Sequence, residues 1–221
     1  MQCNTIIERR AHKMGLMTFK GGVHPFEGKD LSKDKPIREL LPKGELVYPL
    51  SQHIGAPATP IVAVGDSVLK GQKIAEAGGF VSAPIHASVS GTVKKIEPRR
   101  VPTGDMVNSI VIESDGEFKE VEYQAVEDVS ALSKEEIINR IKEAGVVGMG
   151  GAGFPTHVKL SPKEPEKIDY IIANCAECEP YLTSDYRIML DHTEELVEGM
   201  RIILSMFEHA CLLYTSPSPR D

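Results

Sequence analysis

The chain has 221 residues, enough for two modest domains that each bury a hydrophobic core. Its hydrophobic fraction of 41% and its net charge of -7 are those of an acidic globular protein, so we expect no nucleic-acid partner. No apolar run approaches the ~20 residues of a transmembrane helix, and the start lacks the apolar core of a signal peptide, so we expect a cytoplasmic chain.

The first half of the chain predicts a small β domain over residues 49–116. Before it, Met14 and Met17 precede a Gly-rich segment, so we interpret residues 1–16 as an upstream extension and residues 17–48 as an N-terminal segment. The β domain is rich in Val, Ile, Gly and Pro with short apolar runs, which favour short strands and tight turns.

Two similar halves are visible inside this β domain. Residues 61–76 contain a Gly-Asp turn and a second glycine, and they resemble the half-motif of biotinyl and lipoyl domains. Residues 83–97 resemble the partner half. Together the halves predict a barrel-sandwich hybrid.

The hairpin between the halves lacks the residue that a carrier domain needs. Biotinyl and lipoyl carriers present a modified lysine there, whereas residues 78–82 read Gly-Gly-Phe-Val-Ser. We therefore expect a docking or spacing module rather than a covalent carrier. His86 is a lone histidine in an expected strand, without a second His or Cys nearby, and we assign it no role.

A helix and a glycine-rich loop follow the acidic segment 117–128. Ser133 and Glu136 have the spacing of a capping box, apolar residues then recur at helical spacing, and Gly145 supplies a C-terminal stop. The sequence from Gly148 to Thr156 then reads Gly-Met-Gly-Gly-Ala-Gly-Phe-Pro-Thr.

Three glycines of this loop satisfy the G-x-G-x-x-G pattern of dinucleotide-binding folds. The context disfavours a Rossmann fold, because the loop follows a helix rather than a strand and Pro155 comes directly after the last glycine. Several glycines still let backbone N–H groups approach a phosphate or a ring. We interpret the segment as a flavin or nucleotide loop; the alternative is a turn that serves geometry alone.

The apolar run 168–174 predicts a buried strand that ends at Asn174. Glu177 and Glu179 follow at its carboxyl end, where open α/β sheets bind ligands. These side chains can form a hydrogen-bonding edge for a nucleotide, and a plain polar loop is an equal alternative. Cys175 and Cys178 form a C-x-x-C, but no second Cys or His cluster is suitably spaced, so we predict no metal site and keep a redox dithiol as a minor alternative.

The end of the chain begins with an amphipathic helix over residues 193–207. That pattern stops without a capping signal, and residues 211–221 read like translated adapter DNA from a sequencing library. We therefore predict that residues 211–221 are an artefact and that the natural protein continues beyond about Ala210.

Four segments in this order resemble the RnfC family, the C subunits of the Rnf electron-transport complex. They are the Gly-rich motif 19–25, the barrel-sandwich repeat, the glycine loop 148–156, and residues 174–183, which read Asn-Cys-Ala-Glu-Cys-Glu-Pro-Tyr-Leu-Thr. The last two also resemble the FMN- and NADH-binding subunit of respiratory complex I. The implied fold class is a multidomain α+β chain, with the barrel-sandwich hybrid followed by the start of an α/β FMN/NADH-binding domain over residues 117–210.

The resemblance also implies roles for individual residues. Glu179 matches a catalytic carboxylate near the bound nicotinamide, and Phe154 lies near the nicotinamide or adenine. Ala176 stands where the complex I relative has an aspartate, and Cys175 and Ser184 depart from the commoner Rnf pattern. The remaining matched residues contact FMN: Gly148, Gly150, Gly151, Gly153, Lys159, Asn174 and Glu177.

In that family, electrons pass between NADH and ferredoxin through a flavin and two [4Fe-4S] clusters, coupled to sodium or proton transport. The resemblance thus implies FMN and NAD(H) as cofactors, other Rnf subunits as partners, and a peripheral place on the cytoplasmic face of a bacterial membrane. The clusters would lie beyond this fragment, which we expect to be inactive alone. The alternatives are a non-catalytic docking module and a soluble complex I-type NADH dehydrogenase flavoprotein.

Overall fold

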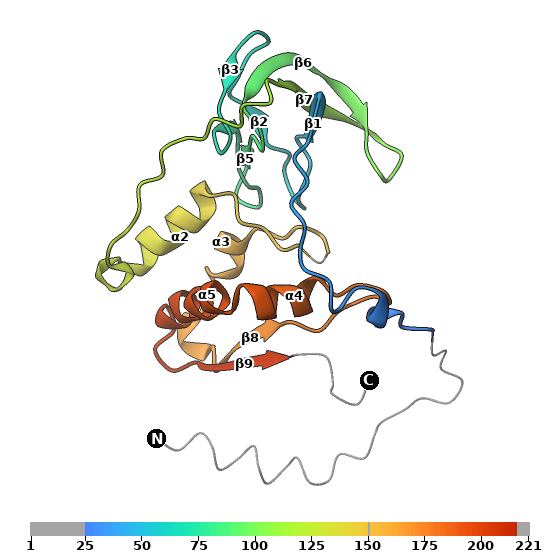
Figure 1. Cartoon of the computed structure of the whole chain (residues 1–221). Helices are drawn as coiled ribbons and strands as arrows, with labels where there is room; N and C mark the ends of the chain where they lie inside the picture. Colours follow the sequence, from blue (N-terminus) through green and yellow to red (C-terminus); the bar gives the residue numbers. More distant parts are fainter. Residues whose placement is uncertain (1–24, 150, 216–221) are drawn as a thin grey trace.

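The computed structural model of the chain describes residues 25–149 and 151–215, whose secondary structure gathers in two parts (Figure 1). An all-β part occupies the top of the view, and helices with a small parallel sheet lie below it. Residues 1–16, the predicted upstream extension, and most of the Gly-rich motif lie outside the described residues.

The all-β part consists of two antiparallel sheets. One has the strand order β1-β7-β6-β3 and the other the order β2-β4-β5. β4 and β5 pair with each other, so residues 78–82 connect them as the predicted hairpin. The strands are β1 (Glu45–Pro49), β2 (Thr59–Pro60), β3 (Ser67–Val68), β4 (Lys73–Glu76), β5 (Ile85–His86), β6 (Gly91–Arg100) and β7 (Met106–Ser114).

The core of this part lies around β7, which lies between β1 and β6 in the four-stranded sheet. Ile110, Val111 and Ile112 in its centre are fully buried, as expected for a strand that is covered on both faces. The predicted Gly-Asp turn is present: Gly65 has φ +99°, and Asp66 Oδ2 accepts a hydrogen bond from the N–H of Ala63 at 2.8 Å.

The sheet begins earlier than the predicted domain boundary at residue 49. All five residues of β1, from Glu45 to Pro49, pair with β7. The alternation of Leu46 and Tyr48 toward the core is too short to predict a strand from the sequence.

The second part combines helices with a parallel strand pair. Its regular elements are α2 (Lys134–Glu143), α3 (Thr156–Lys159), β8 (Tyr170–Asn174), α4 (Ser184–Asp191), α5 (Thr193–Ser205) and β9 (Cys211–Thr215). Three 3-10 helices occur among the described residues: η2 (Lys29–Leu31), η3 (Val129–Ala131) and η4 (Pro165–Lys167). A separate core forms around Ile137, Leu160, Met206 and Phe207. None of the helices in these ranges is long and apolar enough to cross a membrane.

The predicted capping box of α2 is confirmed. Ser133 Oγ accepts a hydrogen bond from the N–H of Glu136 at 3.2 Å, and Glu136 Oε2 accepts one from the N–H of Ser133 at 2.8 Å. Gly145 follows the helix with φ +68°, which glycine adopts without steric cost.

Residues 211–215, which the sequence pattern attributes to an adapter, form a strand here. β9 pairs in parallel with β8, with Ile172 opposite Leu213, and α4 and α5 connect the two strands. The run Cys-Leu-Leu-Tyr has the apolar character that a strand beside β8 needs. The origin of residues 211–221 stays a prediction.

Candidate functional site

A short antiparallel bridge between Val147 and Pro155 joins the two ends of the glycine loop. At this bridge, Gly148 N donates to Phe154 O at 2.9 Å, and Thr156 N donates to Val146 O at 3.0 Å. The loop follows α2 rather than a strand, which confirms the reason for setting the Rossmann fold aside.

The tip of the loop carries backbone donors that no other described residue uses. Among the described residues, the N–H groups of Gly151, Ala152, Gly153 and Phe154 donate to no acceptor. Gly151 is exposed, and a Cβ added there would meet nothing within 4 Å. Successive free N–H groups on an open loop suit the oxygen atoms of a phosphate. Gly150 lies outside the described residues.

The barrel contacts the glycine loop at Ala152 and Gly153. Ile54 N donates to Ala152 O at 2.9 Å. Gly153 has φ +63°, and a Cβ there would lie 2.9 Å from Gln52 O and 3.0 Å from His53 Cα. This packing against the barrel is sufficient to require glycine at position 153, with or without a cofactor.

α3 follows the loop and carries two basic side chains with different surroundings. Lys159 is exposed and forms no ion pair in the described part of the chain. His157 is buried, and its Nε2 lies 3.4 Å from Phe80 O at the hairpin between the barrel halves. Burial lowers the pKa of His157. The hairpin that presents lysine in carrier domains therefore packs against the helix that follows the glycine loop.

The strand-end residues make local hydrogen bonds of their own. Asn174 Oδ1 accepts from the N–H of Ala176 at 3.2 Å. Glu177 Oε1 accepts from the N–H groups of Asp185 and Tyr186 at 2.8 and 3.2 Å, which places this carboxylate at the start of α4. Glu179 is exposed, and its carboxylate accepts no hydrogen bond from any described residue.

The environment of the C-x-x-C disfavours a reactive thiolate at its first position. Cys175 is buried and Cys178 is exposed, and neither forms a disulfide. Burial raises the pKa of Cys175, and the nearby Asp185 carboxylate raises it further. The described residues contain no group of three His, Cys, Asp or Glu side chains arranged to hold a metal ion.

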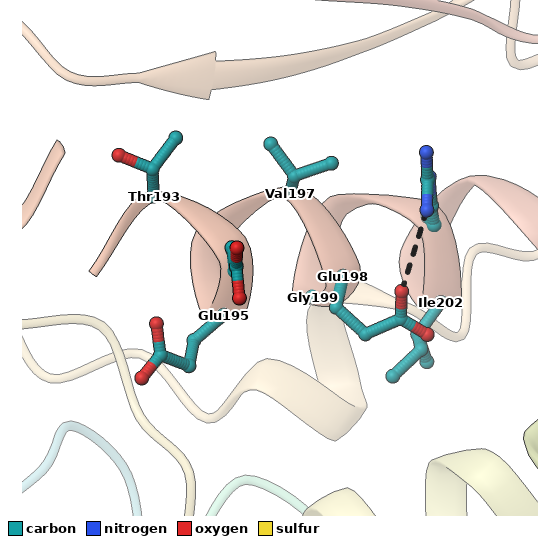
Figure 2. A pocket seen from close by; sticks show the side chains of 8 residues that line it. Thr193, Glu195, Val197, Glu198, Gly199 and Ile202 are labelled. Carbon is teal, nitrogen blue, oxygen red and sulfur yellow. Dashed lines mark ion pairs between the residues drawn. The ribbon is translucent and has the colours of Figure 1, made fainter.

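A shallow depression elsewhere on the surface does not coincide with these residues. It runs along α5, and Figure 2 shows its side chains projecting to different sides of one helix, with an ion pair between Arg201 and Glu198. Ligand sites are concave and place polar groups so that they converge on the ligand. We therefore assign the candidate site to the glycine loop and the strand end, not to this depression.

Direct contacts among the described residues do not join all the predicted site residues. No hydrogen bond or ion pair among the described residues joins the carboxylates of Glu177 or Glu179 to the glycine loop. Two supporting residues were missed: His53 in the barrel beside Gly153, and Lys29, whose Nζ donates to Glu179 O at 3.3 Å. No local pattern predicts either contact, because each partner lies about 100 or more positions away.

Comparison with known proteins assigns a family to both parts. Residues 17–117 match the family model of the RnfC barrel sandwich hybrid domain, and residues 141–215 match that of the Nuo51 FMN-binding domain. These matches confirm the predicted fold class, a barrel-sandwich hybrid followed by an α/β domain of the complex I flavoprotein type.

Curated relatives cover most of this chain. The C subunit of the proton-translocating ferredoxin:NAD(+) oxidoreductase complex of Clostridium ljungdahlii is 48% identical over 86% of the chain and 42% of its own length. The Na(+)-translocating counterpart of Acetobacterium woodii is 44% identical over 85% of the chain and 42% of its own length. The C subunit of the ion-translocating oxidoreductase complex of Haemophilus influenzae strain PittEE is 40% identical over 85% of the chain and 29% of its own length. The chain thus spans less than half the length of these relatives, and it belongs to the RnfC family.

Proposed function

We propose that this chain supplies the flavin- and nicotinamide-binding part of the RnfC protein in an ion-translocating ferredoxin:NAD oxidoreductase. The observation that carries this assignment is the glycine loop, whose four successive N–H groups at residues 151–154 are free among the described residues. The loop lies inside the segment that matches an FMN-binding domain. Relatives that align with both parts of the chain are named as components of such complexes.

The residues present fit an FMN at this loop. Gly151 leaves open space where any other residue would place a Cβ, and the free N–H groups can donate to phosphate oxygens. Lys159 follows at the end of α3 with an ammonium group that has no carboxylate partner among the described residues. In our assignment Gly148, Gly150, Gly151 and Gly153 shape the loop, and Lys159 neutralises the phosphate.

The strand end would complete the site. Asn174 offers an amide to the flavin ring, and Glu177 stiffens the loop by accepting two N–H groups of α4. Glu179 is the exposed carboxylate that would orient the nicotinamide, with Phe154, 37% exposed, as an apolar surface for a ring. A bound flavin supplies the chemistry, because it exchanges two electrons with NADH and single electrons with iron–sulfur clusters. The chain's own residues bind and orient the reactants.

The relatives' names, which place them in multisubunit ion-translocating complexes, support a wider assignment. Other components of the complex would be the partners, at the cytoplasmic face of a bacterial membrane, with ferredoxin supplying electrons through them. Two [4Fe-4S] clusters would be held by the part of the relatives that this chain does not match.

Fluorescence titration with FMN tests the assignment. The chain is compared with a chimera in which it replaces the matching segment of the Clostridium ljungdahlii protein, so that the site is present at the relative's full length. We expect the chimera to bind FMN and to reduce it with NADH. Glu179→Ala should weaken NADH-dependent reduction, whereas Glu135→Ala, which removes an exposed carboxylate of α2, should not.

Two outcomes would contradict the assignment. A chimera that binds neither FMN nor NADH would leave the glycine loop with a structural role only, and the docking-module alternative would then stand. An equal effect of Glu179→Ala and Glu135→Ala would remove the strand end from the site.

A further inference from the structure

The N-terminal segment makes long-range contacts with the loop that carries Glu179. In Figure 1 the chain before β1 descends from the barrel and passes beside the connection between β8 and α4. Residues Glu27 to Lys33 lie about 150 positions from this connection in sequence, yet five hydrogen bonds join them to it and a sixth joins them to α4. Binding of FMN at the glycine loop does not explain these hydrogen bonds between segments that are far apart in the sequence.

The central contact is made by one ammonium group. Lys29 Nζ donates to Glu179 O at 3.3 Å and to Leu182 O at 3.0 Å, so it bridges both sides of the loop. Its hydrogen bonds are charge-assisted, which makes them stronger than those between neutral groups. Glu179 and Leu182 are exposed residues in irregular backbone, and no helix or strand fixes their carbonyls.

Hydroxyl groups and the backbone extend the contact. Ser32 Oγ donates to Tyr181 O at 3.1 Å and accepts from Thr183 Oγ1 at 3.0 Å. Tyr181 N donates to Glu27 O. Arg187 on α4 reaches back to Lys33 O at 3.3 Å.

The loop is also held in a backbone conformation that its residues disfavour. Tyr181 has φ +65°, in the left-handed region that a bulky side chain rarely adopts. Its ring packs edge-on to Phe26, with ring centroids 6.2 Å apart, and covers Gly28, where an added Cβ would lie 2.2 Å from Tyr181 Cε1. Such a conformation persists only where surrounding contacts impose it.

We propose that residues 27–33 are a brace that positions the Glu179 loop, with Lys29 as the positioning residue. The inference rests on the proposed function for its consequence in catalysis, because the brace would set the orientation of Glu179 toward nicotinamide. Lys29 itself need not touch the nucleotide. Its effect is to hold two carbonyls in place so that the loop between β8 and α4 keeps a single shape.

Hydrogen exchange measured by mass spectrometry tests the brace in the 221-residue chain, without any cofactor. In Lys29→Met we expect the backbone amides of residues 179–187 to exchange about tenfold faster, since a charge-assisted contact to two carbonyls is lost. Lys29→Arg should restore most of the protection. Lys35→Met is the control, because its ammonium contacts no acceptor among the described residues.

A second pair of variants tests the packing of the tyrosine ring. Gly28→Ala and Gly44→Ala both place alanine at a positive φ, +62° and +74°, but only the first brings a Cβ against Tyr181. We expect faster exchange over residues 179–187 in Gly28→Ala alone. Equal exchange in Lys29→Met and Lys35→Met, together with equal exchange in both glycine variants, would overturn the brace.

The catalytic consequence is read separately in the full-length chimera. Lys29→Met should raise the KM for NADH by about fivefold or more at unchanged flavin content, and Lys29→Arg should return it toward the starting value. A rise in exchange without any change in KM would overturn the positioning of Glu179 toward nicotinamide. A chimera that binds no flavin would contradict the proposed function, while the exchange result would still decide whether the brace exists.

Discussion

Two glycines of the loop differ in the space around them, and alanine substitutions test their roles separately. Gly153 has φ +63° and a virtual Cβ within 3.0 Å of two barrel atoms, whereas a Cβ on Gly151 meets nothing. Alanine in the left-handed region costs about 1–2 kcal/mol. Gly153→Ala should therefore loosen the contact between loop and barrel by at least this amount, and Gly151→Ala should leave that contact intact.

The N–H of Ile54 reports on this contact, because it donates to Ala152 O across the two parts of the chain. A loss of about 1.4 kcal/mol corresponds to roughly tenfold faster exchange of this amide, if exchange follows local opening. FMN affinity gives the complementary measurement in the full-length chimera. We expect Gly151→Ala to weaken FMN binding without faster exchange at Ile54, since its Cβ would occupy the approach to the free N–H groups.

The pattern of results decides between a ligand loop and a structural turn. Unchanged Ile54 exchange in Gly153→Ala would refute the role of the barrel in holding the loop. Unchanged FMN affinity in Gly151→Ala, with FMN binding present in the parent chimera, would refute the placement of FMN at the tip of the loop.

Three further perturbations follow from the geometry, each read by urea denaturation with far-UV circular dichroism. Ile112→Ala empties a fully buried site in β7 and should lower the free energy of unfolding by about 2–5 kcal/mol, whereas Val47→Ala, 42% exposed, should lower it far less. Ser133→Ala removes the α2 cap and should cost about 1 kcal/mol, with far less loss in Ser51→Ala, because the exposed Ser51 hydroxyl forms no hydrogen bond among the described residues. Burial lowers the pKa of His157, so the folded chain binds the proton less tightly than the unfolded chain, and stability should fall as the pH drops below about 6.5. A His157→Gln chain with an equally steep fall would contradict this.

Local patterns in the sequence were sufficient for several of the regular elements. The capping box at Ser133 and Glu136, the glycine stop at position 145, and the Gly-Asp turn at position 65 all depend on residues within a few positions of one another. β1 was missed at its start because only five residues alternate there, and its partner β7 lies about 60 positions away.

The candidate site was predictable only as separate segments. The spacing of Gly148, Gly150 and Gly153 indicated a ligand loop, but it did not show that Gly153 serves the barrel contact. Similarly, Glu177 appeared in the sequence as one of two carboxylates at a strand end. The structure distinguishes it from Glu179, because Glu177 accepts two N–H groups of α4 while Glu179 stays exposed. Sequence spacing carries no information on such contacts across elements.

The hairpin between the barrel halves contacts the helix that follows the glycine loop. Phe80 O lies 3.4 Å from His157 Nε2 in α3, and Gly78 N donates to Ser82 Oγ at 2.9 Å. A Cβ on Gly78 would lie 2.0 Å from Pro57 O, so the hairpin packs closely on its own domain as well. The barrel thus supports α3 through the hairpin and the glycine loop through residues 52–54.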